Sequence, residues 1–158
     1  AMGISDLRHR GIAELSGGQK QRVAVASVIA LKPRVLVLDE PTAELDPVSS
    51  LAVFELLARY AQENGTTVIV VEQKIALLSD FADMLLIVDG GKIRFQGTPA
   101  EVLERSDELL EIGVNCPRST SLVNRLRARG LVDAPAARNV DEAVKACKQV
   151  LSGEGASA

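Results

Sequence analysis

The chain has 158 residues, of which 47% are hydrophobic and 25% are charged, and these proportions are ordinary for one globular domain. The formal net charge is −3 and aromatic residues make up 3%, so we expect neither a basic surface nor a stacking platform for nucleic acid, and no nucleic-acid partner. No apolar run approaches the roughly 20 residues that cross a bilayer, and we expect no signal peptide. Cys116 and Cys147 lack the spacing of a metal or redox site, and we expect a cytosolic setting to keep them reduced.

The pentapeptide LSGGQ at 15–19 stands directly before a helix predicted over 20–31. Ser16 offers a capping hydroxyl, and Gly17 and Gly18 allow close approach of a ligand because neither has a Cβ. The first N–H groups of a helix have no partner within it. The turn therefore predicts an anion site, most naturally for a phosphate. The alternative is a Ser/Gly turn that only caps the helix.

An apolar run rich in β-branched residues follows at 35–38 and predicts a strand buried on both faces. It ends in Asp39 and Glu40, at the carboxyl end of the strand, where open α/β sheets hold their ligands. Neighbouring residues of a strand point to opposite sides, so the two acids can serve two different tasks. The alternative is that this acid pair merely opens a surface loop.

The rest of the sequence predicts alternating helices and strands. Pro47 opens a helix that closes at Asn64-Gly65, and a second buried strand at 66–71 ends at Glu72 and Gln73. This alternation predicts an α/β fold with a parallel sheet and right-handed crossovers. The elements expected after it are a helix at 75–81, strands at 84–88 and 93–96 around a tight turn at 89–92, and helices at 100–105, 108–112, 119–129 and 141–151.

The order of LSGGQ at 15–19, the strand with its acid pair at 35–40 and the polar turn at 42–47 resembles the ATP-binding-cassette (ABC) ATPase family. In that family these segments are the signature, the Walker B strand and the D-loop. The resemblance implies part of a P-loop NTPase sheet with flanking helices, followed by a helical C-terminal extension. We accordingly expect the C-terminal half of an ABC ATPase domain at 1–97, the extension at 98–151 and a disordered tail at 152–158.

The resemblance also implies the cofactors, ATP and Mg²⁺, and the roles of individual residues. Asp39 matches the residue that holds Mg²⁺, usually through water, and Glu40 matches the residue that polarises the attacking water. Asp46 matches the D-loop aspartate at the interface between two nucleotide-binding domains, and it can also cap the helix at Pro47. The signature residues that would contact ATP held by a second ABC ATPase domain are Ser16, Gly17, Gly18 and Gln19.

The sequence departs from the family pattern in two places. Gln73 stands where the family usually has a histidine that touches the γ-phosphate, and its amide can donate a hydrogen bond but cannot become cationic. Lys74 could substitute for it, and the alternative is a solvated lysine. The 158 residues contain no Walker A run of the form G-x-x-x-x-G-K-S/T. We therefore expect a separate N-terminal Walker A half as a partner, and negligible ATP affinity for this polypeptide by itself.

Segments at 112–117, 122–130 and 140–146 resemble the C-terminal extension of energy-coupling-factor ATPases. Those subunits work with a transmembrane transporter subunit to import vitamins or metal ions, and the extension helps two ATPase subunits associate. The resemblance thus implies a cytoplasmic protein that lies on the inner face of the membrane. The alternatives are a helical cap without a partner role, a non-catalytic interaction fragment, and a soluble ABC ATPase of DNA repair or translation. That last class would show long coiled-coil heptads or a basic arm.

Overall fold

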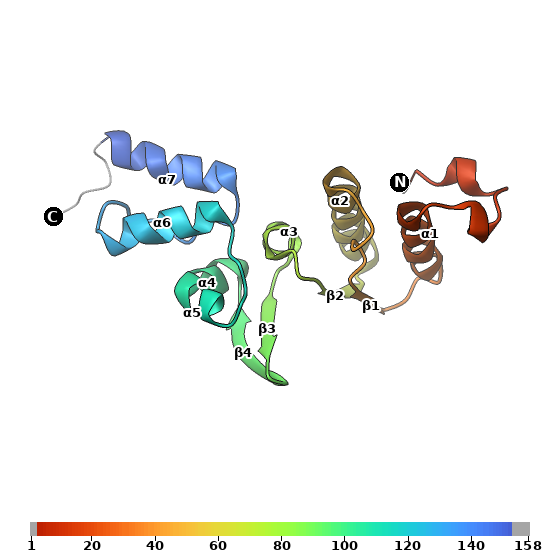
Figure 1. Cartoon of the computed structure of the whole chain (residues 1–158), viewed down its shortest axis with the longest axis horizontal. Helices are drawn as coiled ribbons and strands as arrows, with labels where there is room; N and C mark the ends of the chain where they lie inside the picture. Colours follow the sequence, from red (N-terminus) through yellow and green to blue (C-terminus); the bar gives the residue numbers. More distant parts are fainter. Residues whose placement is uncertain (1–2, 153–158) are drawn as a thin grey trace. The chain divides into compact units, whose positions relative to one another are not determined.

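A computed structural model describes residues 3–152 of the chain, which forms two compact units, Ala1–Gln73 and Lys74–Ala158 (Figure 1). The boundary between the units does not coincide with the domain boundary expected after residue 97, which stays a prediction. Apart from Ser152, the tail expected to be disordered lies outside the described residues.

The first unit is built on a strand–helix–strand crossover. Strands β1 (Val35–Asp39) and β2 (Thr67–Val71) pair in parallel, with Val35 opposite Thr67 and Asp39 opposite Val71. The connection between them is α2 (Pro47–Asn64). This pairing confirms the predicted parallel sheet and brings the carboxyl ends of both strands to one edge.

Local capping determines where the helices of this unit begin. Helix α1 (Gly17–Ala30) starts three residues earlier than predicted, because Ser16 and Gln19 form a reciprocal capping box. Helix α2 begins with Pro47 after the cap at Asp46 and ends at Gly65, whose φ of 62° lies in the left-handed region that glycine tolerates. Two short 3₁₀ turns, Ser5–Leu7 and Ile12–Glu14, precede α1.

Only one face of the parallel sheet is covered, so the prediction of strands buried on both faces is wrong. Leu36 and Leu38 are buried, whereas the alternate residues Val35 and Val37 are 55% and 62% exposed. The helices pack on a single side, and the period-two alternation of a strand leaves the other side chains uncovered. The core of this side consists of Val25, Leu36, Leu38, Val53 and Leu57.

The second unit begins with α3 (Ile75–Phe81) and a hairpin of β3 (Leu85–Asp89) and β4 (Lys92–Gly97). Gly90 and Gly91, with φ values of 54° and 74°, form the tight turn and confirm the predicted hairpin. The expected placement of the third strand in the parallel sheet concerns both units and stays a prediction. Within the second unit β3 pairs with β4 in an antiparallel sheet, because the two-glycine turn folds the chain directly back on itself.

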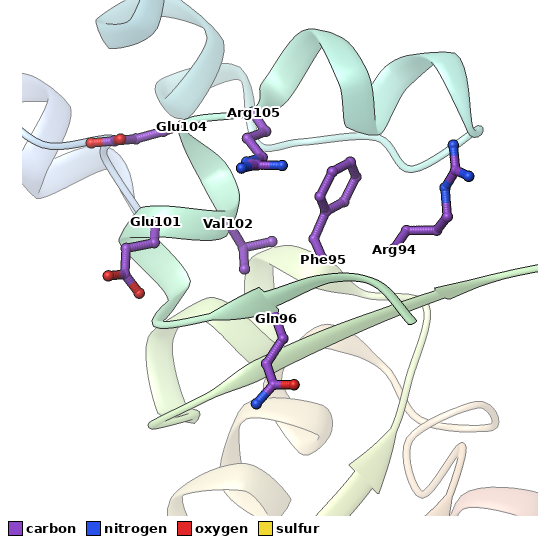
Figure 2. A pocket seen from close by; sticks show the side chains of 7 residues that line it. All are labelled: Arg94, Phe95, Gln96, Glu101, Val102, Glu104 and Arg105. Carbon is purple, nitrogen blue, oxygen red and sulfur yellow. The ribbon is translucent and has the colours of Figure 1, made fainter. Parts of the chain in front are cut away.

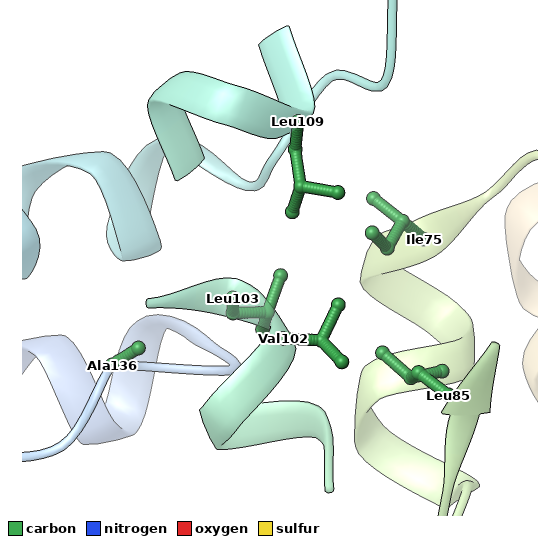
Figure 3. Packing of buried hydrophobic residues seen from close by; sticks show 6 residues of the cluster. All are labelled: Ile75, Leu85, Val102, Leu103, Leu109 and Ala136. Carbon is green, nitrogen blue, oxygen red and sulfur yellow. The ribbon is translucent and has the colours of Figure 1, made fainter. Parts of the chain in front are cut away.

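Four helices complete the second unit, in the places where the sequence predicts them. They are α4 (Pro99–Leu103), α5 (Ser106–Glu111), α6 (Arg118–Ala128) and α7 (Val140–Ser152). Figure 3 shows the side chains of α3, β3, α4 and α5 meeting in one apolar cluster, in which Leu103 and Leu109 are fully buried. Helices α6 and α7 pack on a second cluster around Val123.

Polar contacts hold these helices in place. The Asn124 amide of α6 donates to the Leu103 carbonyl at 2.9 Å and to the Ser106 hydroxyl at 2.9 Å. Asn139 caps α7, since its side-chain oxygen accepts the Glu142 N–H at 3.0 Å. Within residues 3–152, no helix combines the length and the apolar character required to cross a membrane.

Candidate functional site

The polar residues predicted at the ends of β1 and β2 come together in the first unit. Asp39 is the last residue of β1 and lies opposite Val71, the last residue of β2. The side-chain amide of Gln73 donates a hydrogen bond of 2.6 Å to Oε1 of Glu40. The parallel register thus places the acid pair and the glutamine at the same edge, as the sequence predicts.

Glu40 has an unusual backbone conformation, with a φ of 45°. Non-glycine residues seldom adopt this region, and they keep it only when surrounding contacts hold them there. Its N–H donates to the Val71 carbonyl at 2.9 Å, and its carbonyl accepts from the Gln21 side-chain amide at 2.8 Å. The prediction that strand alternation points the side chains of Asp39 and Glu40 to opposite sides is therefore wrong. Strand β1 ends at Asp39, and the left-handed backbone conformation of Glu40 sets the direction of its side chain.

Two further residues of this site were not predicted from the sequence. The Glu72 carboxylate accepts a short hydrogen bond from the Thr42 hydroxyl and, through its second oxygen, a hydrogen bond of 2.9 Å from the Gln73 N–H. Thr42 is completely buried. These contacts close a ring of hydrogen bonds and backbone that runs through Glu40, Thr42, Glu72 and Gln73. The only signal that the sequence carries for this role is that Thr42 follows the acid pair by two residues and that Glu72 directly precedes Gln73.

The signature turn lies at the surface, with Ser16 and Gly17 exposed. The Ser16 hydroxyl accepts the Gln19 N–H at 3.3 Å, and the Gln19 side-chain oxygen accepts the Ser16 N–H at 3.0 Å. The capping role of Ser16 is therefore confirmed, whereas the anion-binding role of Ser16, Gly17, Gly18 and Gln19 stays a prediction.

The two signature glycines allow a close approach within the chain itself. A Cβ on Gly17 would lie 3.1 Å from a carboxylate oxygen of Glu44, and a Cβ on Gly18 would lie 3.3 Å from the Glu44 carbonyl and 3.1 Å from Leu45. The N-terminus of α1 thus packs directly against the turn before α2.

Asp46 caps α2, as one of its two expected roles requires. Its Oδ1 accepts the N–H groups of Val48 and Ser49 at 3.0 Å each, and its Oδ2 accepts the Ser49 hydroxyl at 2.6 Å. The hydrogen bond from the Ser49 hydroxyl is the largest cause that lowers the pKa of Asp46 below its ordinary value, and the Ser49 N–H adds to it. Its role at an interface between two domains stays a prediction.

A hollow of about 450 Å³ lies in the first unit between α1 and the end of β1. Asp39, Lys20 and Glu44 are its charged lining residues, and the side of α1 adds Ala24 and Val28. Among residues 3–152 no group of three or more His, Cys, Asp or Glu side chains is arranged to hold a metal ion. A cation at Asp39 would thus have to complete its coordination with water or substrate oxygens, as Mg²⁺ commonly does.

A second hollow, of about 510 Å³, lies in the second unit between β4 and α4 (Figure 2). The Arg105 guanidinium lies over the Phe95 ring, 5.0 Å from its centre. Two acids of the lining have other partners, since Glu101 accepts from Thr98 and Glu104 pairs with Arg127 at 3.1 Å. None of the residues predicted for the site lines this hollow.

Comparisons with known proteins agree with this geometry. The family model described as ABC transporter matches residues 1–43. The energy-coupling factor transporter ATP-binding protein EcfA2 of Symbiobacterium thermophilum is 40% identical over 147 residues, which are 93% of this chain and 51% of that protein.

Two solved structures extend the comparison to the fold. The structure of cbiO1 from Clostridium perfringens, part of the ABC transporter complex cbiONQ, is 33% identical with a TM-score of 0.59, covering 80% of this chain and 49% of that one. An ATP-binding cassette in a dimeric post-hydrolysis state, bound to ADP and Pi, is 32% identical with a TM-score of 0.52, covering 55% of this chain and 37% of that one.

The parallel sheet, the signature turn and the acid pair agree with these similarities, which are all to ABC transporter ATPase domains. Within that class the chain is similar to the ATP-binding proteins of energy-coupling factor transporters. The chain spans about half the length of the curated relatives that it matches.

Proposed function

We propose that these residues belong to the ATPase subunit of an ABC-type importer that couples ATP hydrolysis to the uptake of a vitamin or metal ion. The observation that carries the proposal is the hydrogen bond between Glu40 and Gln73 at the carboxyl edge of a parallel sheet. Open α/β sheets bind their ligands at this edge. The similarity to energy-coupling factor ATP-binding proteins supports the same function.

Each site residue has a chemical task in this proposal. Glu40 accepts a proton from the attacking water, and the Gln73 amide contacts the γ-phosphate. Asp39 offers Mg²⁺ a hard carboxylate oxygen, and the ion would supply positive charge that neutralises the phosphates when bound. Since the 158 residues contain no P-loop motif, the phosphates served by Asp39 and Glu40 would be held by residues outside this sequence.

The signature turn acts on a different nucleotide in this proposal. The N-terminus of α1 carries a partial positive charge and lies at the surface, where Ser16, Gly17, Gly18 and Gln19 can face ATP held by a second ABC ATPase domain. Asp46 belongs to the same surface of the dimer. The remaining partner is a transmembrane transporter subunit, with which the ATPase lies on the inner face of the membrane.

Replacement of Glu40 tests the proposed chemistry. In a complete subunit carrying this sequence, Glu40→Gln should lower the rate of ATP hydrolysis at least about 100-fold, because the amide cannot accept the proton of the attacking water. Phosphate release measures the rate, and a fluorescent nucleotide analogue checks that ATP still binds. The matched control is Gln62→Ala, which changes an exposed residue of α2. An unchanged rate in Glu40→Gln would reject Glu40 as the base.

One observation favours a second candidate, a non-catalytic ABC-derived subunit for association. Gln73 cannot supply the positive charge of a protonated histidine, and its amide already engages the Glu40 carboxylate. In this alternative the complete wild-type subunit binds ATP and dimerises without hydrolysing it, so the same phosphate-release assay separates the two functions.

A further inference from the structure

We infer that Gln21 is a positioning residue that holds Glu40 in its left-handed turn and ties it to the helix of the signature. The inference rests on the proposed function for its catalytic meaning, whereas the contact itself is a property of the fold. Gln21 lies on α1, two residues beyond the capping-box residue Gln19, and its side-chain amide donates to the Glu40 carbonyl at 2.8 Å across 19 residues of sequence.

The hydrogen bond from Gln21 stabilises the backbone of Glu40, which has an unfavourable conformation. Glu40 and Lys32 are the only non-glycine residues among those described with a positive φ, and Lys32 lies exposed two residues after the end of α1. Conformations of this kind persist only where neighbouring groups over-determine them. The Glu40 carbonyl receives the Gln21 amide from one side and the Ala43 N–H, at 3.2 Å, from its own turn.

Three elements therefore hold Glu40 through three different groups. Helix α1 holds its carbonyl through Gln21, β2 holds its N–H through Val71, and the segment that follows β2 holds its carboxylate through Gln73. Of these three contacts, only the one from Gln21 comes from the signature helix. A shift of α1 along its axis would consequently pull directly on the backbone of Glu40.

This arrangement joins two sites that would serve different nucleotides. The N-terminus of α1 would face the ATP of a second domain, and Glu40 would serve the ATP of its own domain. Because Ser16 caps the helix that contains Gln19 and Gln21, contacts made by the signature turn are transmitted to Glu40 through one helix and one hydrogen bond. To make this contact, the side chain at position 21 needs the length of a glutamine and an N–H donor at its end.

Amide hydrogen exchange, measured by NMR on the 158-residue chain, tests the contact without any nucleotide. Gln21→Met and Gln21→Glu keep the length of the side chain and remove its donor. Either change should speed exchange of the Glu40 N–H about three- to tenfold, the effect of losing one hydrogen bond. The Thr67 N–H, which donates to Arg34 at the opposite end of the sheet, is the internal reference and should not change.

The outcomes separate positioning from general destabilisation. Faster exchange at Glu40 with an unchanged Thr67 supports the inference. Equal rates in Gln21→Met, Gln21→Glu and the control Gln62→Ala would overturn it, as would equal acceleration at both amides.

A kinetic assay of the complete subunit then tests the catalytic meaning of the contact. Gln21→Met should lower kcat about tenfold and leave KM nearly unchanged, because the substituted group orients the base without touching the nucleotide. A variant with wild-type kcat would overturn the positioning role. If the wild-type subunit itself fails to hydrolyse ATP, the proposed function fails, and the exchange rates still decide whether Gln21 holds Glu40.

Discussion

At the scale of single residues, several carboxylates are held by donors close to them in sequence. The Ser49 hydroxyl lowers the pKa of Asp46, the Thr98 N–H lowers that of Glu101, and the Arg138 guanidinium lowers that of Glu142. In each case hydrogen bonds favour the charged form of the acid. All three carboxylates lie at or near the start of a helix, where a negative charge also complements the helix dipole.

The pair of Glu142 with Arg138 yields a prediction on pH dependence. A carboxylate whose pKa is lower in the folded than in the unfolded chain stabilises the fold above its ordinary pKa of 4.5, and this contribution disappears as pH falls through the folded pKa. Because Glu142 and Arg138 are 30% and 41% exposed, solvent screening reduces the effect. Glu142→Gln should lower the free energy of unfolding by about 0.5 kcal/mol at pH 7.

Urea unfolding at pH 7 and at pH 3 checks this prediction. The wild-type chain and Glu142→Gln should converge at the lower pH, where the carboxylate is protonated. Glu108→Gln is the control, since Glu108 and Arg105 are more than half exposed and 4.0 Å apart. A difference that persists unchanged at pH 3 would assign the effect to packing instead of charge.

At the scale of elements, the start of α1 combines a favourable cap with two residues of low helix propensity. Glycine costs a helix roughly 0.5–1 kcal/mol relative to alanine, so its presence twice in the first turn requires a reason. The close approach of Glu44 and Leu45 supplies one, independently of any ligand. The sequence alone suggested only the approach of a phosphate.

Alanine at these two positions should therefore have unequal effects. In Gly17→Ala the nearest atom is the end of a flexible carboxylate, which can move away. In Gly18→Ala the Cβ meets the Glu44 carbonyl at 3.3 Å, and the backbone must shift. We expect Gly18→Ala to be less stable than Gly17→Ala by about 1 kcal/mol in urea unfolding. Equal stability of the two variants would show that the backbone of the turn before α2 can move away from the added Cβ without cost.

At the scale of the whole molecule, one face of the parallel sheet is apolar and is not covered by any described helix of the first unit. Val35, Val37, Ile69 and Val71 are each between 46% and 62% exposed on the uncovered side of β1 and β2. Clusters of exposed apolar side chains on strands favour association with another surface. We expect the chain to associate with itself when concentrated, unless another segment covers this face.

Substitutions at neighbouring positions of β1 should affect self-association and stability differently. Val37→Thr should reduce the scattered light of a concentrated solution and change the free energy of unfolding by less than about 0.5 kcal/mol, because Val37 is exposed. Leu36→Ala, one residue earlier and 2% exposed, should cost about 2–4 kcal/mol. Light scattering and urea unfolding measure the two effects. A wild-type chain that stays monomeric at all concentrations would contradict the first expectation.

Features that depend on near neighbours were predictable from the sequence. The caps at Ser16, Asp46 and Asn139 and the hairpin at Gly90 and Gly91 follow from hydrogen bonds or backbone conformations spanning a few residues. The acid pair after β1 was recognisable because a buried strand and its end can be read from an apolar run. The resemblance to ABC ATPases then supplied candidate roles that no local pattern contains.

By itself the sequence determined the order and type of the main elements and several of the residues that cap them, because propensity and capping act locally. Only the tertiary structure decided that Gln21 reaches Glu40 across 19 residues, that Glu72 reaches Thr42 across 30, and that the sheet is covered on one face. These contacts depend on strand register and on which helix face packs inward. Such choices arise from the combined packing of distant segments, so no single stretch of the chain encodes them.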